Sequence, residues 1–520
     1  MAHRVPCTRS RLRWFRLASG VLLALAGATA PCRADVVLAS PFTNHMVLQR
    51  DLPVPVWGTA AAGEAVTVDF AGQRKNVIAG PDGKWRVDLD PLPASAEGRS
   101  VTVTGDHTAA PVKVDDVLVG EVWLASGQSN MEFKMSKKLA SWAGVTNEAQ
   151  EIAAADFPAI RMFTAKLTTA ATPKERVTGE WQVCTPENAP GFSAIGYYFA
   201  RDLHRELKVP VGVVTVAFGA SCAQAWIRHD AIAAVPELKA QLDVYDEKLK
   251  NYVPPSEAEL APWREAVEKA KADGKRPPRQ PKPSPADDQH NPTTCYNGML
   301  APIVPYAVRG VIWYQGESIT QPAELFPLWN ATLIADWRKL WGRELPFYFF
   351  QLAALDNKSN SPKVRAWQAE ALKLPNTAMV VTIDIGDRKD VHPHNKQDAG
   401  ARAARIALAR EYGRTVEYVG PTFESMAVEQ NAIRVRFAHA AGLMTKDGKL
   451  PAAFEIAGSD GKYVPAEAAL DGETAVIRAA AVPMPVSVRY AWANYPAGAN
   501  VMNGAGLPCA PFRTDSTPDR

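Results

Sequence analysis

Ser129 is the side chain of this sequence whose surroundings best suit a nucleophile. It follows the apolar stretch Val117–Leu124 and lies in the short run Ala125-Ser126-Gly127-Gln128-Ser129-Asn130-Met131. A buried strand that runs into a tight turn lifts the next side chain out at the carboxyl edge of a sheet, where a hydroxyl can meet a substrate. Serine, asparagine and glycine are also common in ordinary capped turns, so this run needs support from elsewhere. An activated serine requires a base, a group that orients the base, and donors for an oxyanion.

The base is expected in a carboxylate-rich loop that follows the apolar run 378–383. This loop has the sequence Asp384-Ile385-Gly386-Asp387-Arg388-Lys389-Asp390-Val391-His392-Pro393-His394. A histidine that lies among carboxylates just before a helix is what a serine nucleophile needs as a general base. We therefore predict that His392 is the base, and that His394 is an ordinary surface histidine.

Two further strand ends offer oxyanion donors. Gly219 follows the run 211–217, and its backbone N–H can approach an oxyanion because no side chain blocks it; a plain turn is the alternative. Gln315 follows the run 310–314, and its side-chain amide suits the same role. Glu317 either orients Gln315 or another group of the site, or satisfies buried backbone donors.

The central part of the chain, residues 116–414, has the pattern of an α/β domain. Near-continuous apolar runs of strand length are typical of a parallel sheet covered on both faces. Such runs occupy 211–217, 310–314 and 378–383, and helices are expected at 195–207, 328–341 and 396–412. Prolines and lysines are too dense for a core near 275–283, so we predict a surface insertion at about 228–294, with a charged helix at 256–273.

The two flanks of this domain are predicted to be rich in β-structure. Residues 35–115 contain short apolar runs separated by glycine and proline, which is typical of a β-sandwich. Residues 415–520 return to short strands. The pattern does not decide whether this second β-rich part forms its own sandwich.

Residues 1–34 are predicted to be a secretory signal peptide. Five arginines precede the apolar run 17–30, which is too short for a comfortable membrane span, and small residues follow it. Removing this segment removes six arginines and no acidic residue, so the formal charge of +3 falls by six to −3. A nucleic-acid partner is therefore not expected, nor a membrane after cleavage. The protein is expected to be exported to the periplasm or the extracellular space.

Four cysteines remain after such cleavage, namely Cys184, Cys222, Cys295 and Cys509. Their wide spacing does not match any common zinc-ligand pattern. In an oxidising compartment they can form disulfides in one of three pairings or stay as buried thiols, and the sequence leaves both open.

The order of these blocks resembles the sialate O-acetylesterase family, a branch of the SGNH (GDSL-like) hydrolase superfamily. The matching motifs are Gly127-Gln128-Ser129-Asn130-Met131, Gly219, Trp313-Tyr314-Gln315-Gly316-Glu317-Ser318 and Asp390-Val391-His392-Pro393. Further signatures are Asn44–Arg50, Tyr296–Met299, Val488–Trp492 and Gly506–Pro508, so the resemblance covers about 36–515.

The resemblance implies a three-layer α/β/α catalytic domain and hydrolysis of sugar O-acetyl esters without a metal or cofactor. It implies Ser129 as nucleophile, His392 as base, and Ser129, Gly219 and Gln315 as the oxyanion hole. Gln128, Asn130, Glu317 and Asp387 are possible supporting residues.

Two positions depart from the wider superfamily. The acid usually stands three residues before the histidine, where this chain has Lys389, so Asp390 is the first candidate for the triad, with Asp387 and Asp384 behind it. The pair Gly219-Ala220 stands where relatives often have two glycines. A backbone donor survives this change unless the backbone at Ala220 must adopt positive φ.

Three functions are compatible with these residues: a sialate O-acetylesterase, an acetylesterase of plant xylan or xyloglucan, and a glycan-binding protein without turnover. The third is disfavoured because nucleophile, base and donor blocks are all present. Trp226 and Trp313 near strand ends suit any neutral glycan, whereas a sialate carboxylate needs a nearby cation such as Arg228 or Arg388. The oligomeric state and the acetylated hydroxyl are not specified by the sequence.

Overall fold

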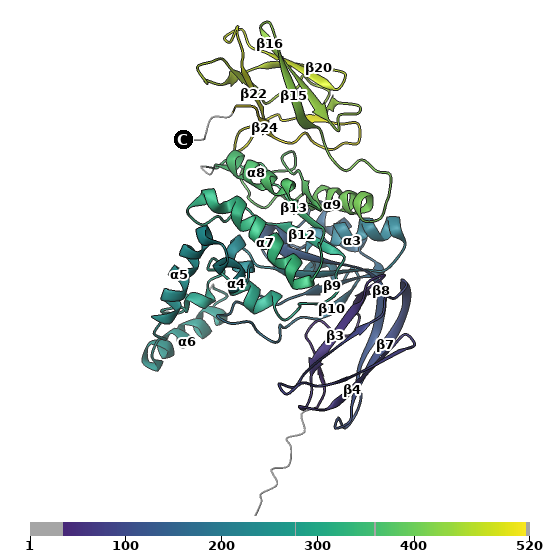
Figure 1. The fold of residues 1–520 in the computed structure, drawn as a ribbon. Helices are drawn as coiled ribbons and strands as arrows, with labels where there is room; N and C mark the ends of the chain where they lie inside the picture. Colours follow the sequence, from purple (N-terminus) through teal and green to yellow (C-terminus); the bar gives the residue numbers. More distant parts are fainter. Residues whose placement is uncertain (1–34, 276, 358–359, 516–520) are drawn as a thin grey trace, which may run out of the picture.

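A computed structural model describes residues 35–275, 277–357 and 360–515. The predicted signal peptide and its two cysteines lie outside the described residues. The fold is of the mixed α/β class and is built around a mixed sheet. In Figure 1 the N-terminal β-rich part and the C-terminal β-rich part lie at opposite ends of the central α/β part.

Strand β8 (Val112–Gly127) joins the N-terminal part to the central part. Its first half pairs antiparallel with β7 (Ser95–Gly105), and residues 118–120 pair in parallel with β2 (Val47–Gln49). Its second half pairs in parallel with β11 (Val211–Ala217) and β12 (Gly310–Tyr314). The boundary predicted between residues 115 and 116 therefore falls inside one continuous strand.

The central sheet has the strand order β10-β9-β11-β8-β12-β13-β14. The neighbours from β9 to β14 run parallel, and β10 pairs antiparallel with β9. Parallel strands place their carboxyl ends at one edge, where such sheets bind ligands. The strands not yet given bounds are β9 (Phe157–Thr164), β10 (Trp181–Cys184), β13 (Phe347–Phe350) and β14 (Thr377–Val380).

Helices cover both faces of this sheet because its strands are apolar on both sides. Alternate residues such as Trp123, Tyr314 and Tyr348 lie in one buried cluster with α3 (Ala194–Leu207) and α9 (Lys396–Arg410). Their neighbours Leu124, Trp313 and Phe349 lie in another cluster with α7 (Phe326–Trp341). The helices at 195–207, 328–341 and 396–412 thus form as predicted.

The predicted insertion forms a helical excursion. It contains α4 (His229–Ala233), α5 (Pro236–Lys250) and α6 (Glu257–Ala272), and α6 buries no residue. A capping box between Ser256 and Glu259 starts α6, which lies at the lower left of Figure 1. The helix expected at 256–273 is therefore present on the surface.

The N-terminal part contains a small sheet with the order β1-β3-β6 and a hairpin, β4 with β5, that joins β7. These strands are β1 (Val37–Leu38), β3 (Val54–Thr59), β4 (Ala65–Phe70), β5 (Gln73–Ile78) and β6 (Lys84–Leu89).

The C-terminal part contains two sheets with the orders β15-β16-β21-β20 and β19-β18-β22-β24, and a short pair of β17 with β23. Their bounds are β15 (Thr422–Glu429), β16 (Ala432–Ala438), β17 (Met444–Thr445), β18 (Phe454–Ala457), β19 (Val464–Pro465), β20 (Glu467–Asp471), β21 (Thr474–Arg478), β22 (Ser487–Tyr490), β23 (Val501–Met502) and β24 (Phe512–Arg513).

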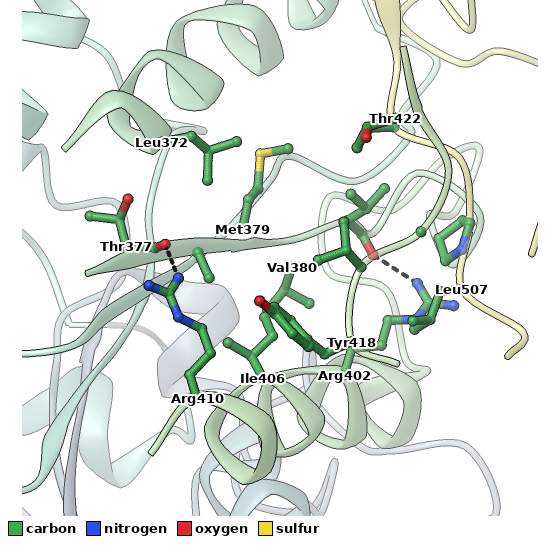
Figure 2. A pocket seen from close by; sticks show the side chains of 16 residues that line it. Leu372, Thr377, Met379, Val380, Arg402, Ile406, Arg410, Tyr418, Thr422 and Leu507 are labelled. Atoms are coloured by element: carbon green, nitrogen blue, oxygen red, sulfur yellow. Dashed lines mark hydrogen bonds between the residues drawn. The ribbon is translucent and has the colours of Figure 1, made fainter. Parts of the chain in front are cut away.

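Strand β14 is the edge of the central sheet, and two arginines of α9 contact a carbonyl of this strand and the carbonyl of the residue that follows it. Arg410 donates to the carbonyl of Thr377, and Arg402 donates to that of Val381 at 2.8 Å, as Figure 2 shows. A cavity of about 160 Å³ lies here between β14, α9 and the chain leading into the C-terminal part. Because an uncovered strand edge invites pairing with another chain, these arginines protect the edge.

Candidate active site

The turn that carries Ser129 follows directly from β8. Gly127 has φ +132°, and a side chain there would collide with the Tyr314 carbonyl on the neighbouring strand β12, 2.1 Å away. Glycine is therefore required where the two strands end side by side. Ser129 is the first residue of the short helix α1 (Ser129–Glu132), and it is partly exposed beyond the carboxyl end of β8.

The structure brings Ser129 and His392 together across 263 positions of the sequence. His392 Nε2 lies 2.9 Å from Ser129 Oγ, which is the distance of a hydrogen bond. Asp390 accepts a hydrogen bond of 2.8 Å from the His392 backbone N–H, and the same carboxylate oxygen lies 3.5 Å from His392 Nδ1. The three predicted catalytic groups thus lie in the order carboxylate, imidazole, hydroxyl.

Two aromatic rings hold the imidazole in place. The ring centroids of Trp142 and His392 are 4.7 Å apart, and those of Phe133 and His392 are 6.4 Å apart. Burial lowers the pKa of His392, and the charge of Lys396 lowers it further, while Asp390 opposes the shift. The imidazole is therefore kept in its neutral form, which is the form that can accept a proton.

Asn130, the residue after the nucleophile, connects two charged side chains beneath the site. Its Nδ2 donates to Glu317 Oε1 at 2.5 Å and to the Val391 carbonyl at 3.0 Å. Its Oδ1 accepts a hydrogen bond of 2.5 Å from Lys396 Nζ. Of the two roles considered for Glu317, the structure supports contact with another group of the site, since Asn130 is its partner.

Lys396 is buried at the start of α9, and its ammonium lies 4.4 Å from the ring centroid of Phe133. Burial lowers its pKa to about 7. Burial also raises the pKa of Glu317, against the opposing hydrogen bond from Asn130. Two opposite charges connected by one amide therefore fix the position of the residue next to Ser129.

Gly219 lies beside the nucleophile, but its N–H has a partner in this structure. A side chain on Gly219 would begin 3.6 Å from Ser129 Cβ, so its backbone adjoins the reacting group. The Gly219 N–H donates a hydrogen bond of 2.7 Å to Glu132 Oε2. Burial raises the pKa of Glu132, and the Gly219 hydrogen bond opposes this rise.

Gln315 does not occupy the position predicted for it. Its side chain is buried, and its Nε2 donates to the carbonyls of Ser318 at 2.6 Å and Ser221 at 3.4 Å. Strand alternation explains the difference: Gln315 continues the face of Trp313 toward α7, and it lines a cavity with that residue and Leu333. The amide therefore stabilises the turn after β12 and does not point at Ser129.

Gln128 also stabilises this turn. Its Oε1 accepts hydrogen bonds of 3.3 Å from the backbone N–H groups of Gly316 and Ser318. The carboxylates considered behind Asp390 have other partners. Asp387 accepts from the N–H groups of Lys389 and Asp390 and shapes their turn, while Asp384 forms a bidentate ion pair with Arg402 at 2.7 Å.

Of the side chains suggested for glycan contact, the two tryptophans are buried and the two arginines are paired with carboxylates. Trp226 and Trp313 are 0% and 3% exposed. Arg228 pairs with Asp336 at 2.7 Å, and Arg388 pairs with Asp356 at 3.0 Å. The tryptophans thus belong to the core, and both arginines already have carboxylate partners.

The remaining sequence-based expectations concern metals, thiols and membranes. Within residues 35–275, 277–357 and 360–515, no group of three or more His, Cys, Asp or Glu side chains is placed to hold a metal ion. Cys184, Cys222, Cys295 and Cys509 are buried free thiols, which decides between the two states considered. In the described part of the chain, no helix is both long enough and apolar enough to cross a membrane.

Glu132, Trp142 and Lys396 are site residues that sequence reasoning missed. Glu132 stands three positions after Ser129, on the single turn of α1, and this proximity was an available signal. Lys396 begins the predicted helix at 396–412, where a lysine normally faces solvent. Trp142 lies in a loop whose path the sequence pattern does not specify.

Comparison with known proteins identifies relatives of this chain. Residues 288–412 match the family model described as "Carbohydrate esterase, sialic acid-specific acetylesterase". The chain is 27% identical to the sialate O-acetylesterase of Rattus norvegicus, over 92% of this chain and 93% of that protein. It is 26% identical to the Homo sapiens sialate O-acetylesterase, over 88% of each.

Among solved structures, a carbohydrate acetylesterase from Xanthomonas citri superposes with a TM-score of 0.77. The two chains are 32% identical, and the alignment covers 93% of this chain and all of the other. This identity over the full length of a solved relative goes beyond a shared fold. The chain belongs to the sialate O-acetylesterase family of carbohydrate acetylesterases and is a carboxylic ester hydrolase.

Proposed function

We propose that this protein removes O-acetyl groups from sugars through an acyl-enzyme formed on Ser129. The observation that carries the proposal is the 2.9 Å contact between Ser129 Oγ and His392 Nε2. His392 accepts the hydroxyl proton as Ser129 Oγ attacks the acetyl carbonyl carbon. It then returns the proton to the sugar oxygen as the ester C–O bond breaks. Water attacks the acetyl-enzyme by the same route and releases acetate and Ser129.

Asp390 acts on the imidazole in this proposal. A carboxylate next to Nδ1 fixes the tautomer in which Nε2 is the proton acceptor, and it stabilises the imidazolium that forms. The carbonyl oxygen becomes an oxyanion next to the backbone N–H groups of Ser129 and Gly219. Glu132 must leave the Gly219 N–H before an oxyanion can take its place.

The catalytic part is assigned to the three-layer α/β/α arrangement of SGNH hydrolases, with Ser129, Gly219 and His392 at one sheet edge. The helices on both faces and the parallel strand order support this assignment. The protein is proposed to act after export to the periplasm or the extracellular space, on the basis of its N-terminal sequence.

The decisive experiment for the mechanism is Ser129→Ala. This variant is expected to keep the wild-type unfolding midpoint and to lose acetate release from a chromogenic acetyl ester. Ser141→Ala is the matched control because Ser141 is an exposed serine in the neighbouring loop. Retention of full activity by Ser129→Ala would refute the nucleophile assignment.

The natural substrate is identified by comparing acetate release from O-acetylated sialic acid, acetyl-xylan and acetylated xyloglucan at equal ester concentration. If the kcat/KM of the wild-type enzyme is highest on O-acetylated sialic acid, the result supports a sialate esterase. The highest value on either polysaccharide supports the plant cell-wall alternative.

A further inference from the structure

A groove of about 430 Å³ lies next to the catalytic pair, over the carboxyl ends of β12 and β13. Its lining includes Glu317 after β12, Leu352 after β13, and Trp367 of α8 (Ser361–Ala369). The volume is that of a small-ligand site. Its position outside the carboxyl ends of parallel strands is where α/β sheets bind ligands.

The near end of the groove is formed by residues that contact the catalytic machinery. Val391, which precedes His392, lines it, and the Val391 carbonyl accepts a hydrogen bond of 3.0 Å from Asn130. Glu317 lines it as well and is bonded to Asn130 through its other oxygen, Oε1. A ligand in the groove is therefore adjacent to whatever group Ser129 attacks.

Two features of the lining match the surface of a sugar ring. Glu317 Oε2 is buried and has no hydrogen-bond partner among the described residues, so it is a free acceptor. Trp367 is only partly buried, and with Leu352 and Phe326 it forms a small apolar cluster under the groove. Sugars have apolar ring faces and outward hydroxyl donors, so a lining that combines an aromatic side chain with a carboxylate acceptor suits them.

The wall of the groove is held rigidly. Arg365 of α8 is completely buried, and its guanidinium donates to the carbonyls of Leu352 at 2.8 Å and Ala493 at 2.8 Å. Leu355 N–H donates to the Asn494 carbonyl at 3.1 Å. These bonds hold residues 352–355 against the C-terminal part, and a wall that is already ordered spares a ligand the entropy of ordering it.

We propose that this groove is a subsite for a neutral sugar unit that neighbours the acetylated unit, with Trp367 as its specificity-determining wall. The proposal rests on the esterase function above and extends it from the acetyl group to the glycan chain. A sugar hydroxyl donates to Glu317 Oε2 while the ring lies against Trp367. The lining holds two carboxyl groups, Glu317 and Glu324, and one lysine, Lys363, whose ammonium lies 5.2 Å from the Trp367 ring centroid; a sialate carboxylate is therefore disfavoured, and a neutral glycan is the favoured occupant.

The test compares two substrates on the same variants. Wild-type enzyme and Trp367→Ala are assayed on a neutral acetylated xylo-oligosaccharide and on p-nitrophenyl acetate, which contains no sugar. We expect kcat/KM of Trp367→Ala to fall about tenfold on the oligosaccharide, mainly through KM, and to change less than twofold on the small ester. Trp367→Tyr keeps an aromatic ring and is expected to restore most of the loss.

Two controls separate packing from recognition. Trp367→Leu keeps an apolar side chain over Phe326 and Leu352, so it serves if Trp367→Ala does not fold. Trp263→Ala removes a tryptophan from the surface helix α6 and is expected to leave both activities unchanged. The deacetylated oligosaccharide should inhibit wild-type enzyme competitively, and Trp367→Leu less.

The outcomes distinguish this proposal from the esterase function. If the ratio of kcat/KM between Trp367→Ala and wild type is the same on both substrates, the subsite is overturned. The proposed esterase function would still stand in that case, provided that activity depends on Ser129. Loss of oligosaccharide activity in Trp263→Ala to the same extent would also overturn the subsite. If Ser129→Ala retained activity, the proposed function would fail whatever Trp367 did.

Discussion

The carboxylate of Glu132 accepts a hydrogen bond of 2.7 Å from the Gly219 N–H, the group on which the proposed oxyanion hole depends. The carboxylate therefore lies where the substrate oxygen would have to accept the same hydrogen. Because Glu132 is partly buried, its charge is only weakly screened and also acts on any negative charge that develops there. Glu132 thus competes with the transition state for one donor.

Glu132→Gln is expected to raise kcat/KM for a small acetyl ester about fivefold at neutral pH. A neutral amide oxygen forms a hydrogen bond about 1 kcal/mol weaker than a carboxylate does, so the Gly219 N–H becomes easier to release. The measurement is the initial rate of acetate release at several ester concentrations. Glu148→Gln, which alters a carboxylate bonded to Ser136, is the control. A lower kcat in Glu132→Gln would mean that the carboxylate assists the reaction.

Asp390→Asn is expected to lower kcat by roughly 10²–10⁴-fold with little change in the unfolding midpoint. An amide beside His392 Nδ1 no longer stabilises the imidazolium, although it can still accept from the His392 N–H. Asp387→Asn, in the same loop, should cost much less, because Asp387 contacts backbone N–H groups and not the imidazole. Steady-state kinetics on one ester ranks the two variants. The reverse ranking would place Asp387 behind the base.

The acid limb of the kcat/KM profile is expected below the ordinary histidine pKa of 6.5, because burial and Lys396 lower the pKa of His392. A lowered pKa keeps the imidazole neutral and active as the pH falls, so activity is lost only at more acidic pH. Lys396→Met removes a charge that is present below about pH 7, and it should move the limb to higher pH.

Lys389→Gln is the matched control for this shift because Lys389 is an exposed lysine of the His392 loop. Its pH profile should superpose on that of wild type. The profile of Lys396→Met is compared only after circular dichroism shows a native fold, since the substitution leaves Glu317 without its nearby cation. A limb that stays in place in folded Lys396→Met contradicts the electrostatic coupling.

Ala220→Gly is expected to stabilise the protein by about 0.5–1 kcal/mol. Ala220 has φ +60°, the left-handed conformation that costs an L-residue about 1–2 kcal/mol, against about 0.4–1 kcal/mol of extra chain entropy for glycine. Urea denaturation measures the change. Ala154→Gly, at φ −86°, is the control and should destabilise. If both variants lose stability, the positive φ at position 220 carries no strain.

Much of the central architecture could be predicted from the sequence because local pattern and tertiary environment agree there. The apolar runs at 211–217 and 310–314 become β11 and β12 with the same bounds. Phe347–Phe350, an equally apolar run, was not predicted as a strand because it is short and follows a helix after a brief connection. Short aromatic runs fit buried helices and strands alike.

The site was less predictable than the fold. Ser129 and His392 could be found because each follows a strong strand signal, and parallel strands bring such ends together. The direction of the Gln315 side chain could not be predicted. A shift of one residue along a strand moves a side chain from the face toward α7 to the face toward α9. Glu132 and Trp142 depend on how a turn and a loop fold back over Ser129, which no periodicity encodes.

Strand β8 has a consequence for how the N-terminal part can be altered. The residues that pair with β7 and the residues that lead to Ser129 belong to one run of alternating side chains. A single inserted or deleted residue inside β8 would exchange inward and outward faces on one side of the change and would strain the pairing on the other. Strands β4, β5 and β7, which are paired in series with β8, are therefore not an exchangeable module. These strands and the nucleophile are expected to vary together among relatives that keep activity.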